Sequence, residues 1–218
     1  YQRMRDVLGD LRALKRMHDS TASTGTAGAN DGGIPSIAVL PFVDMSPDHD
    51  QEYFCEGIAE ELIDHLAQFK DLRVAARTSS FQFRRAPLDI RDIGHRLGVG
   101  AVLEGGVRKA GERLRITAQL VKIPEGHHLW SARFDRDTHD VFAIQEEIAR
   151  NIVQALQVRL TFAARRTPRT TDVRAYEYYL RGRKFFYQYR SKGIEHALQM
   201  FSLAIKHDPN FALAYAGS

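Results

Sequence analysis

Four carboxylates follow one another at helical spacing in one early segment: Glu56, Glu60, Glu61 and Asp64. Paired carboxylates can carry general acid–base chemistry when their surroundings separate their pKa values. A solvated acidic helix face has the same spacing, and we expect this simpler arrangement here. Cys55 lies in the first turn of the same predicted helix, where the helix dipole favours a thiolate. Because no base accompanies it, we expect Cys55 to be buried in the core.

Histidines and glycines provide weaker signals for a metal or a phosphate group. His127 and His128 are adjacent, so on a strand they point to opposite faces and do not readily share one ion with His139. Asp48 to Asp50 are typical of a solvated loop. Gly98-Val99-Gly100 lacks the third glycine of a phosphate loop and does not open a helix. The sequence therefore predicts neither a metal site nor a cofactor.

Arginines are concentrated in the middle of the chain and provide the strongest signal for binding. If they gather in space, they can hold an anion, an acidic partner or nucleic acid. Aromatic interleaving is limited to Phe81 and Phe83, which does not favour nucleic acid. The candidate anion or partner surface comprises Arg77, Arg84, Arg85, Arg108, Arg113 and Arg115.

The composition is that of a folded protein. The chain has 218 residues, 44% hydrophobic residues and a net charge of +4. Its single cysteine excludes an internal disulfide framework, and no apolar run reaches the roughly 18 residues of a membrane span. The chain begins with Tyr1 and carries no secretory signal, so we expect an internal piece of a longer polypeptide in the cytoplasm, with the periplasm as the alternative.

Five segments follow from the pattern of apolar residues. Residues 1–18 predict a basic amphipathic helix, and residues 19–35 a flexible linker of small and polar residues. Residues 36–162 predict an α/β (α+β) domain, a mixed sheet with flanking helices in the order β-α-β-α-β-β-β-α. Residues 163–174 are polar and predict a second linker, and residues 175–218 predict an α-helical hairpin with the start of a third helix. Within the α/β domain we expect Trp130 to anchor the core.

The last segment resembles a tetratricopeptide repeat. Ala197, Phe201, Ala204 and Pro209 have the spacing of the second helix of that repeat, and Leu180 and Gly182 roughly match the first. Because one repeat cannot bury its own apolar faces, the resemblance implies that further repeats follow and that Phe211, Leu213 and Tyr215 are otherwise exposed. The candidate residues for repeat packing or a partner surface are Tyr176, Tyr179, Leu180, Ala197, Phe201, Ala204 and Pro209, and we expect packing for the nearby Phe186, Tyr187 and Tyr189 too.

The middle segment resembles the TolB-like amino-terminal domain of bacterial multidomain proteins over about residues 36–160. The matching stretches are Ser36–Phe42, Glu52–Leu62, Arg77–Phe81, Val102–Arg108, Arg115–Leu120, His128–Ser131 and Phe142–Ile148. The resemblance implies a mixed α/β fold that usually precedes tetratricopeptide repeats. It implies no established catalytic activity and supplies no catalytic residues.

The opening residues resemble the helix that closes the catalytic domain of bacterial Ser/Thr protein kinases. Tyr1-Gln2, Asp6, Asp10 and Leu11 carry this resemblance. The motifs of kinase chemistry itself are absent from the chain, so the resemblance implies a kinase parent rather than a kinase activity here. Adenylate cyclases and winged-helix transcription regulators are the alternative parents, since they carry the same module.

We therefore expect a non-catalytic regulatory and protein-interaction region of a bacterial signalling protein, foremost a Ser/Thr protein kinase. Its partners are expected to be proteins that bind the repeat region. The alternative is that the α/β domain senses a small molecule or nucleotide for an attached cyclase or winged-helix regulator. Nucleic acid is not an expected partner, and no segment of the chain is expected in a membrane.

Overall fold

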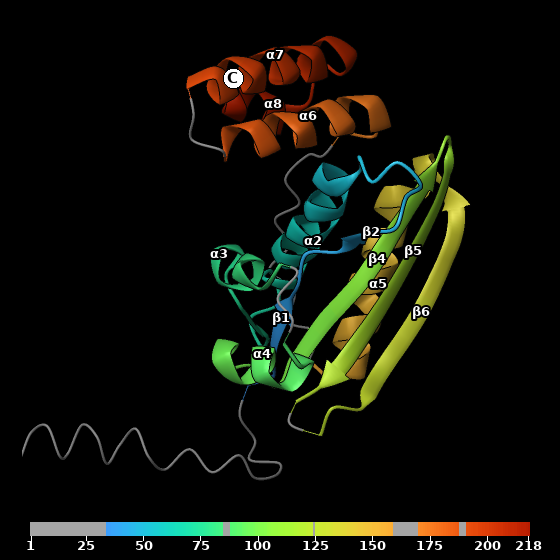
Figure 1. Cartoon of the computed structure of the whole chain (residues 1–218), viewed down its shortest axis with the longest axis vertical. Helices are drawn as coiled ribbons and strands as arrows, with labels where there is room; N and C mark the ends of the chain where they lie inside the picture. Colours follow the sequence, from blue (N-terminus) through green and yellow to red (C-terminus); the bar gives the residue numbers. More distant parts are fainter. Residues whose placement is uncertain (1–33, 85–87, 124, 159–169, 188–190) are drawn as a thin grey trace, which may run out of the picture. The chain divides into compact units, whose positions relative to one another are not determined.

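The mixed sheet forms from strands of two kinds. The computed structural model describes residues 34–84, 88–123, 125–158, 170–187 and 191–218. Within these residues, a six-stranded sheet has the order β3-β1-β4-β5-β6, and β2 pairs with β4 off this path (Figure 1). The predicted helix over residues 1–18, most of the linker that follows it, Arg85 and Tyr189 lie outside the described residues.

The first strands are parallel and the later ones antiparallel. The parallel strands are β1 (Ser36–Val39), β2 (Val43–Asp44), β3 (Arg73–Val74) and β4 (Ala101–Ala110) in their pairings with one another. β5 (Arg113–Lys122) and β6 (His128–Asp137) continue from β4 as an antiparallel meander. The apolar run of β1 is buried because both faces of the sheet are covered there, whereas β5 alternates buried and outward residues.

Helices cover both faces of the sheet, but not along its whole length. The main core lies between one face and the helices α2 (Glu52–Leu66) and α5 (Val141–Ala155), which also pack on each other. A smaller core lies under α4 (Ile90–Leu97) on the opposite face, around Val102 and Val121. The short helices α3 (Arg77–Ser80) and η1 (Phe81–Phe83) lie between β3 and α4 in the chain.

The predicted fold class and element order are confirmed. The two-residue strand β2 and the short helices α3 and η1 were not predicted, because each is too brief to show a period. The prediction for Trp130 was wrong in degree. Trp130 lies on the edge strand β6, where no further strand covers it, and is only half-buried.

Three helices complete the described chain: α6 (Val173–Phe186), α7 (Ser191–His207) and α8 (Ala212–Gly217). α6 begins inside the predicted linker because the Asp172 carboxylate accepts hydrogen bonds from the backbone N–H groups of Arg174 and Ala175. α6 and α7 approach closely, since a Cβ at Gly182 would lie 2.6 Å from the Phe201 ring. The expected exposure of Phe211 was wrong, because it is 2% exposed and packs edge-on against Tyr179.

Gly105 allows β4, β5 and the loop after β1 to pack together. A Cβ at this position would collide with the Thr117 carbonyl oxygen and would lie 2.6 Å from the Phe42 ring. We expect Gly105→Ala to lower the free energy of unfolding by at least about 2 kcal/mol, because backbone and a buried ring have to move. Gly100→Ala is the matched control, since its Cβ would meet nothing closer than the Ser36 hydroxyl at 3.6 Å. Urea unfolding of both variants measures the difference, and equal losses would contradict this view.

Candidate functional site

The carboxylates of α2 face the helical region rather than water. Glu56, Glu60 and Glu61 are 8%, 5% and 3% exposed, and of the four predicted carboxylates Asp64 alone is exposed. The predicted solvated helix face was therefore wrong. The reason is that α6 packs on α2, a contact between segments about half the chain apart that the periodicity of α2 cannot reveal.

Glu60 lies at the centre of a network of ion pairs. One carboxylate oxygen pairs with Nε of Arg77 from α3, and the other lies 2.5 Å from Nη2 of Arg183 on α6. Glu56, one turn earlier, pairs with Arg84 and lies 3.9 Å from Nη2 of Arg77. The carboxylates of Glu56 and Glu60 are thus balanced by cations from two other parts of the chain, as burial of charge requires.

Aromatic rings enclose the central guanidinium groups. The guanidinium carbon of Arg77 lies 4.2 Å from the ring centre of Phe81 and 4.1 Å from that of Tyr187, which ends α6. Arg183 lies 5.6 Å from the ring centre of Tyr179 and 5.7 Å from that of Tyr187. Rings at these distances attract a cation and shield it from water. Tyr187 is 38% exposed, but its ring contacts the guanidinium groups of both Arg77 and Arg183.

A more exposed rim surrounds this centre. Glu52 lies 2.9 Å from Nζ of Lys184 and 3.4 Å from Nη1 of Arg84. Arg181 donates a hydrogen bond of 3.1 Å to the Tyr53 hydroxyl. At the end of the β4–β5 hairpin, Lys109 pairs with Glu177 of α6. We call the set that joins α2 to α6 the α2–α6 joint; it comprises Glu52, Glu56, Glu60, Arg77, Arg84, Arg183 and Lys184.

The electrostatics of the joint indicate a structural contact rather than acid–base catalysis. Burial raises the pKa of Glu56 although Arg84 opposes the shift, and burial lowers the pKa of Arg77. The cavity between the helices is about 10 Å³, which leaves no room for a substrate. Cys55 is fully buried, and burial raises the pKa of its thiol, so it is not an activated nucleophile.

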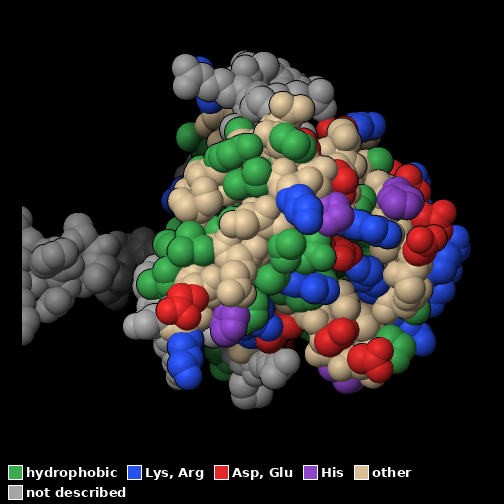
Figure 2. Space-filling view, turned by 90° about the horizontal axis from the view of Figure 1, so that it is seen from above, with side chains coloured by type: hydrophobic (Ala, Val, Ile, Leu, Met, Phe, Trp, Pro, Cys, Tyr) green, Lys and Arg blue, Asp and Glu red, His purple; other side chains and the backbone are tan. Residues whose placement is uncertain are grey.

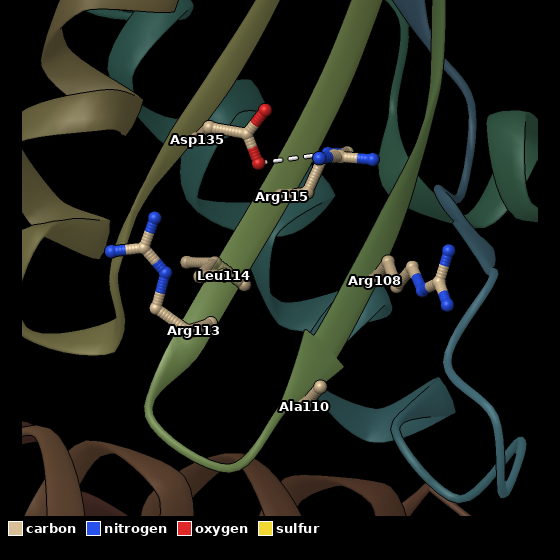
Figure 3. Close-up of a pocket in the computed structure, with 6 residues that line it drawn as sticks. All are labelled: Arg108, Ala110, Arg113, Leu114, Arg115 and Asp135. Carbon is tan, nitrogen blue, oxygen red and sulfur yellow. Dashed lines mark hydrogen bonds and ion pairs between the residues drawn. The ribbon is translucent and has the colours of Figure 1, made fainter.

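A second group of arginines lies on the outward face of β4 and β5, away from the joint. Arg113 and Arg115 pair with Asp137 and Asp135 of β6 at 3.2 Å and 2.8 Å. Arg108 is exposed and makes no ion pair with the described residues. An open depression of about 360 Å³ lies on this face, lined by Arg108, Ala110, Arg113, Leu114, Arg115 and Asp135. In Figure 3, Arg108 and Arg113 extend in opposite directions, so the guanidinium groups do not converge on one point.

The predicted arginine surface is therefore divided. Arg77 and Arg84 belong to the α2–α6 joint, Arg108, Arg113 and Arg115 to the outward sheet face, and Arg85 lies outside the described residues. Sequence reasoning missed Arg183 and Lys184. Two features of the sequence could have indicated them. One is the adjacent cations near the end of α6, and the other is the row of carboxylates on α2, which has no neighbouring cations in the sequence of α2 itself.

The seven residues predicted for packing or a partner surface lie mostly inside. Tyr176, Tyr179 and Leu180 of α6 are buried, and the Tyr176 hydroxyl accepts a hydrogen bond from the Gln145 amide of α5. Ala197, Phe201 and Ala204 of α7 are also buried, whereas Pro209 is exposed between α7 and α8. The assignment of these helices to a tetratricopeptide repeat stays a prediction.

Exposed apolar and charged side chains occupy different parts of the surface. Phe186, Ile194, Leu198 and Tyr215 of the last three helices are each at least 44% exposed. In the view of Figure 2, charged side chains gather on the right, the side on which β5 and β6 lie in Figure 1.

The described part of the chain contains no group of three or more histidine, cysteine, aspartate or glutamate side chains placed to hold a metal. None of its helices combines the length and apolar character that a bilayer span needs.

Fold and joint together define a mixed α/β domain that holds a helical region against its central helix. Residues 33–154 match the family of the HilA/YgeH-like transcriptional regulator, second domain, and the chain belongs to this family. It is 43% identical over 185 residues to the protein named putative adenylate cyclase 3 of Rhizobium meliloti (strain 1021). The match covers 84% of this chain and 32% of that protein, so the chain spans about a third of the length of this relative.

Solved structures with similarity to this chain share little sequence with it. TolB of Acinetobacter baumannii is 16% identical with a TM-score of 0.41, over 60% of this chain and 30% of TolB. The C-terminal domain of LpoB from Salmonella enterica is 12% identical with a TM-score of 0.40, over 54% of this chain and 91% of that domain. TolB is among the solved structures to which this chain is similar. A kinase parent finds no support in these comparisons.

Removal of the central carboxylate should separate the helical region from the α/β domain. We expect Glu60→Gln to lower the free energy of unfolding by about 3 kcal/mol, because Arg77 and Arg183 would stay buried without their shared anion. Hydrogen exchange should rise first in α6 and α7, before the β4–β5–β6 meander. Glu112→Gln in the exposed β4–β5 turn is the control and should change neither measurement. Unchanged exchange in α6 would show that the joint does not hold the helical region.

Proposed function

We propose that this chain is a non-catalytic regulatory and protein-interaction module of a longer bacterial signalling polypeptide. The observation that carries the proposal is that one module matches two classes of protein. Its family is named for a transcriptional regulator, and a relative over most of the chain is named an adenylate cyclase. A module that accompanies both DNA binding and nucleotide chemistry is best explained as a regulator of either output.

The parent polypeptide is then proposed to carry a cyclase or a DNA-binding domain outside this chain. These are the alternatives that the sequence left open beside a kinase, and the family and the relative favour them. ATP and DNA are both found in the cytoplasm, which is therefore the compartment we propose. The tightly packed α2–α6 joint supports a role in communication, because a partner that binds the helical region would act on the α/β domain through buried contacts.

The proposal is tested in the full-length polypeptide by its output activity, cyclic nucleotide synthesis or DNA binding. Glu60→Gln should change this activity at least about fivefold, the scale of a typical coupling between sites. Glu112→Gln should leave the activity as in the natural protein. Catalysis by the 218-residue chain alone would overturn the proposal, as would an output that responds neither to Glu60→Gln nor to deletion of the module.

A second candidate function is the binding of a small anion on the outward sheet face. The observation that favours it is the depression beside Arg108 and Arg113, where Arg108 has no carboxylate partner among the described residues. A nucleotide or another polyphosphate has the charge that such a surface attracts. The proposed module would then sense this ligand for its output domain.

Calorimetric titration of the chain with ATP and with inorganic triphosphate tests the anion site. Binding should weaken at least about tenfold in the double variant R108A/R113A, because both guanidinium groups contribute positive charge to this face of the sheet. The control is Arg96→Ala on α4, an exposed arginine outside the depression. Absence of binding by either compound, or equal binding by the double variant, would exclude this second function.

A further inference from the structure

Strand β6 presents a long free edge. It runs over ten residues, and among the described residues it pairs with β5 alone. The opposite edge of the sheet, β3, has only two residues. In Figure 1, β6 lies at the outer rim of the sheet, with α5 behind the strands. A long row of unpaired backbone N–H and C=O groups is a template on which another strand can assemble.

Backbone geometry limits how two copies of β6 can pair. In an antiparallel ladder, opposed residues direct their backbone groups either both toward the partner or both away from it. In a symmetric pair, one residue must therefore lie directly opposite the same residue of the second copy, with the two-fold axis midway between them. In the middle of β6 this residue is Ala132, Arg133, Phe134 or Asp135.

Charge selects one of these four registers. An axis at Arg133 or at Asp135 would place two like charges directly opposite each other, which is unfavourable. An axis at Ala132 would place Arg133 opposite Ser131 and leave its charge unmatched. An axis at Phe134 places Arg133 opposite Asp135 of the second copy, and it does so twice. The charge pattern of β6 is therefore self-complementary in a single register.

We propose that β6 pairs antiparallel with β6 of a second copy of this chain, about a two-fold axis at Phe134. On the outward face, Asp135 would lie between its own Arg115, at 2.8 Å in the present structure, and Arg133 of the second copy. Within one copy, Nε of Arg133 already lies 3.5 Å from Oδ2 of Asp135, and the two side chains are 67% and 41% exposed, so both can also reach the second copy. In this register the half-buried Ala132 lies opposite Arg136 of the second copy, and the added strand would cover it.

This dimer does not rest on the proposed function, and it is tested on the 218-residue chain itself. Sedimentation equilibrium should show a reversible dimer. Arg133→Glu should weaken it roughly tenfold or more, because two attractive cross-strand pairs become repulsive. Asp135→Lys should act in the same direction, and the double variant R133E/D135K should restore the dimer because the opposed charges again differ. Arg96→Glu, a charge reversal on α4 away from the edge, should have no effect.

A disulfide test determines the register while it leaves the Arg133–Asp135 pairs beside the axis unchanged. In the proposed register Ser131 lies opposite Asp137 of the second copy, so a mixture of S131C and D137C chains should cross-link under mild oxidation. Cys55 does not compete because it is buried. A natural chain that stays monomeric at every concentration would overturn the proposal. So would a dimer that withstands Arg133→Glu, or one whose mixed cysteine chains do not cross-link.

Discussion

The buried carboxylate of Glu60 is the constraint on which the arrangement of the molecule depends. A charge with so little contact with water requires compensation, and the two guanidinium groups that provide it come from α3 and α6. The position of α6 on α2 follows from this requirement and from close packing, since a Cβ at Gly57 would lie 2.5 Å from Cδ2 of Leu180. The position of α7 follows in turn, because Phe201 packs against Gly182 and Tyr179 of α6.

The molecule divides its charged residues between two environments with different consequences. At the centre of the joint, rings and helices exclude water, so the charges of Glu60, Arg77 and Arg183 are fixed by their partners and salt has little effect on them. On the outward sheet face, the pairs of Arg113 and Arg115 remain in contact with solvent and contribute little to stability. The first environment sets the structure, and the second remains available for contacts with other molecules.

The sequence predicted the α/β fold well because its elements have clear periods. The alternation of apolar residues in β5 and their spacing in α2 and α5 are local properties, so they can be recognised in the sequence before the fold is known. The candidate site was predicted only in part. The acidic residues of α2 have the pattern of a solvated face, and their burial depends on α6, which lies more than a hundred residues later. The sequence could not show which arginines lie in the joint and which on the sheet face, because all of them are the same type of residue and only the fold separates them.

The long separation between the partners in the joint also bears on the order of folding. Lys184 and Glu52 are 132 positions apart in the chain, whereas the β4–β5–β6 meander is made of neighbouring strands. Contacts between near neighbours form early, because they close short loops, and distant contacts form late. During synthesis, Glu60 therefore stays hydrated until the ribosome has released α6. We therefore expect the carboxylate and its two arginines to lose their bound water together, late in folding.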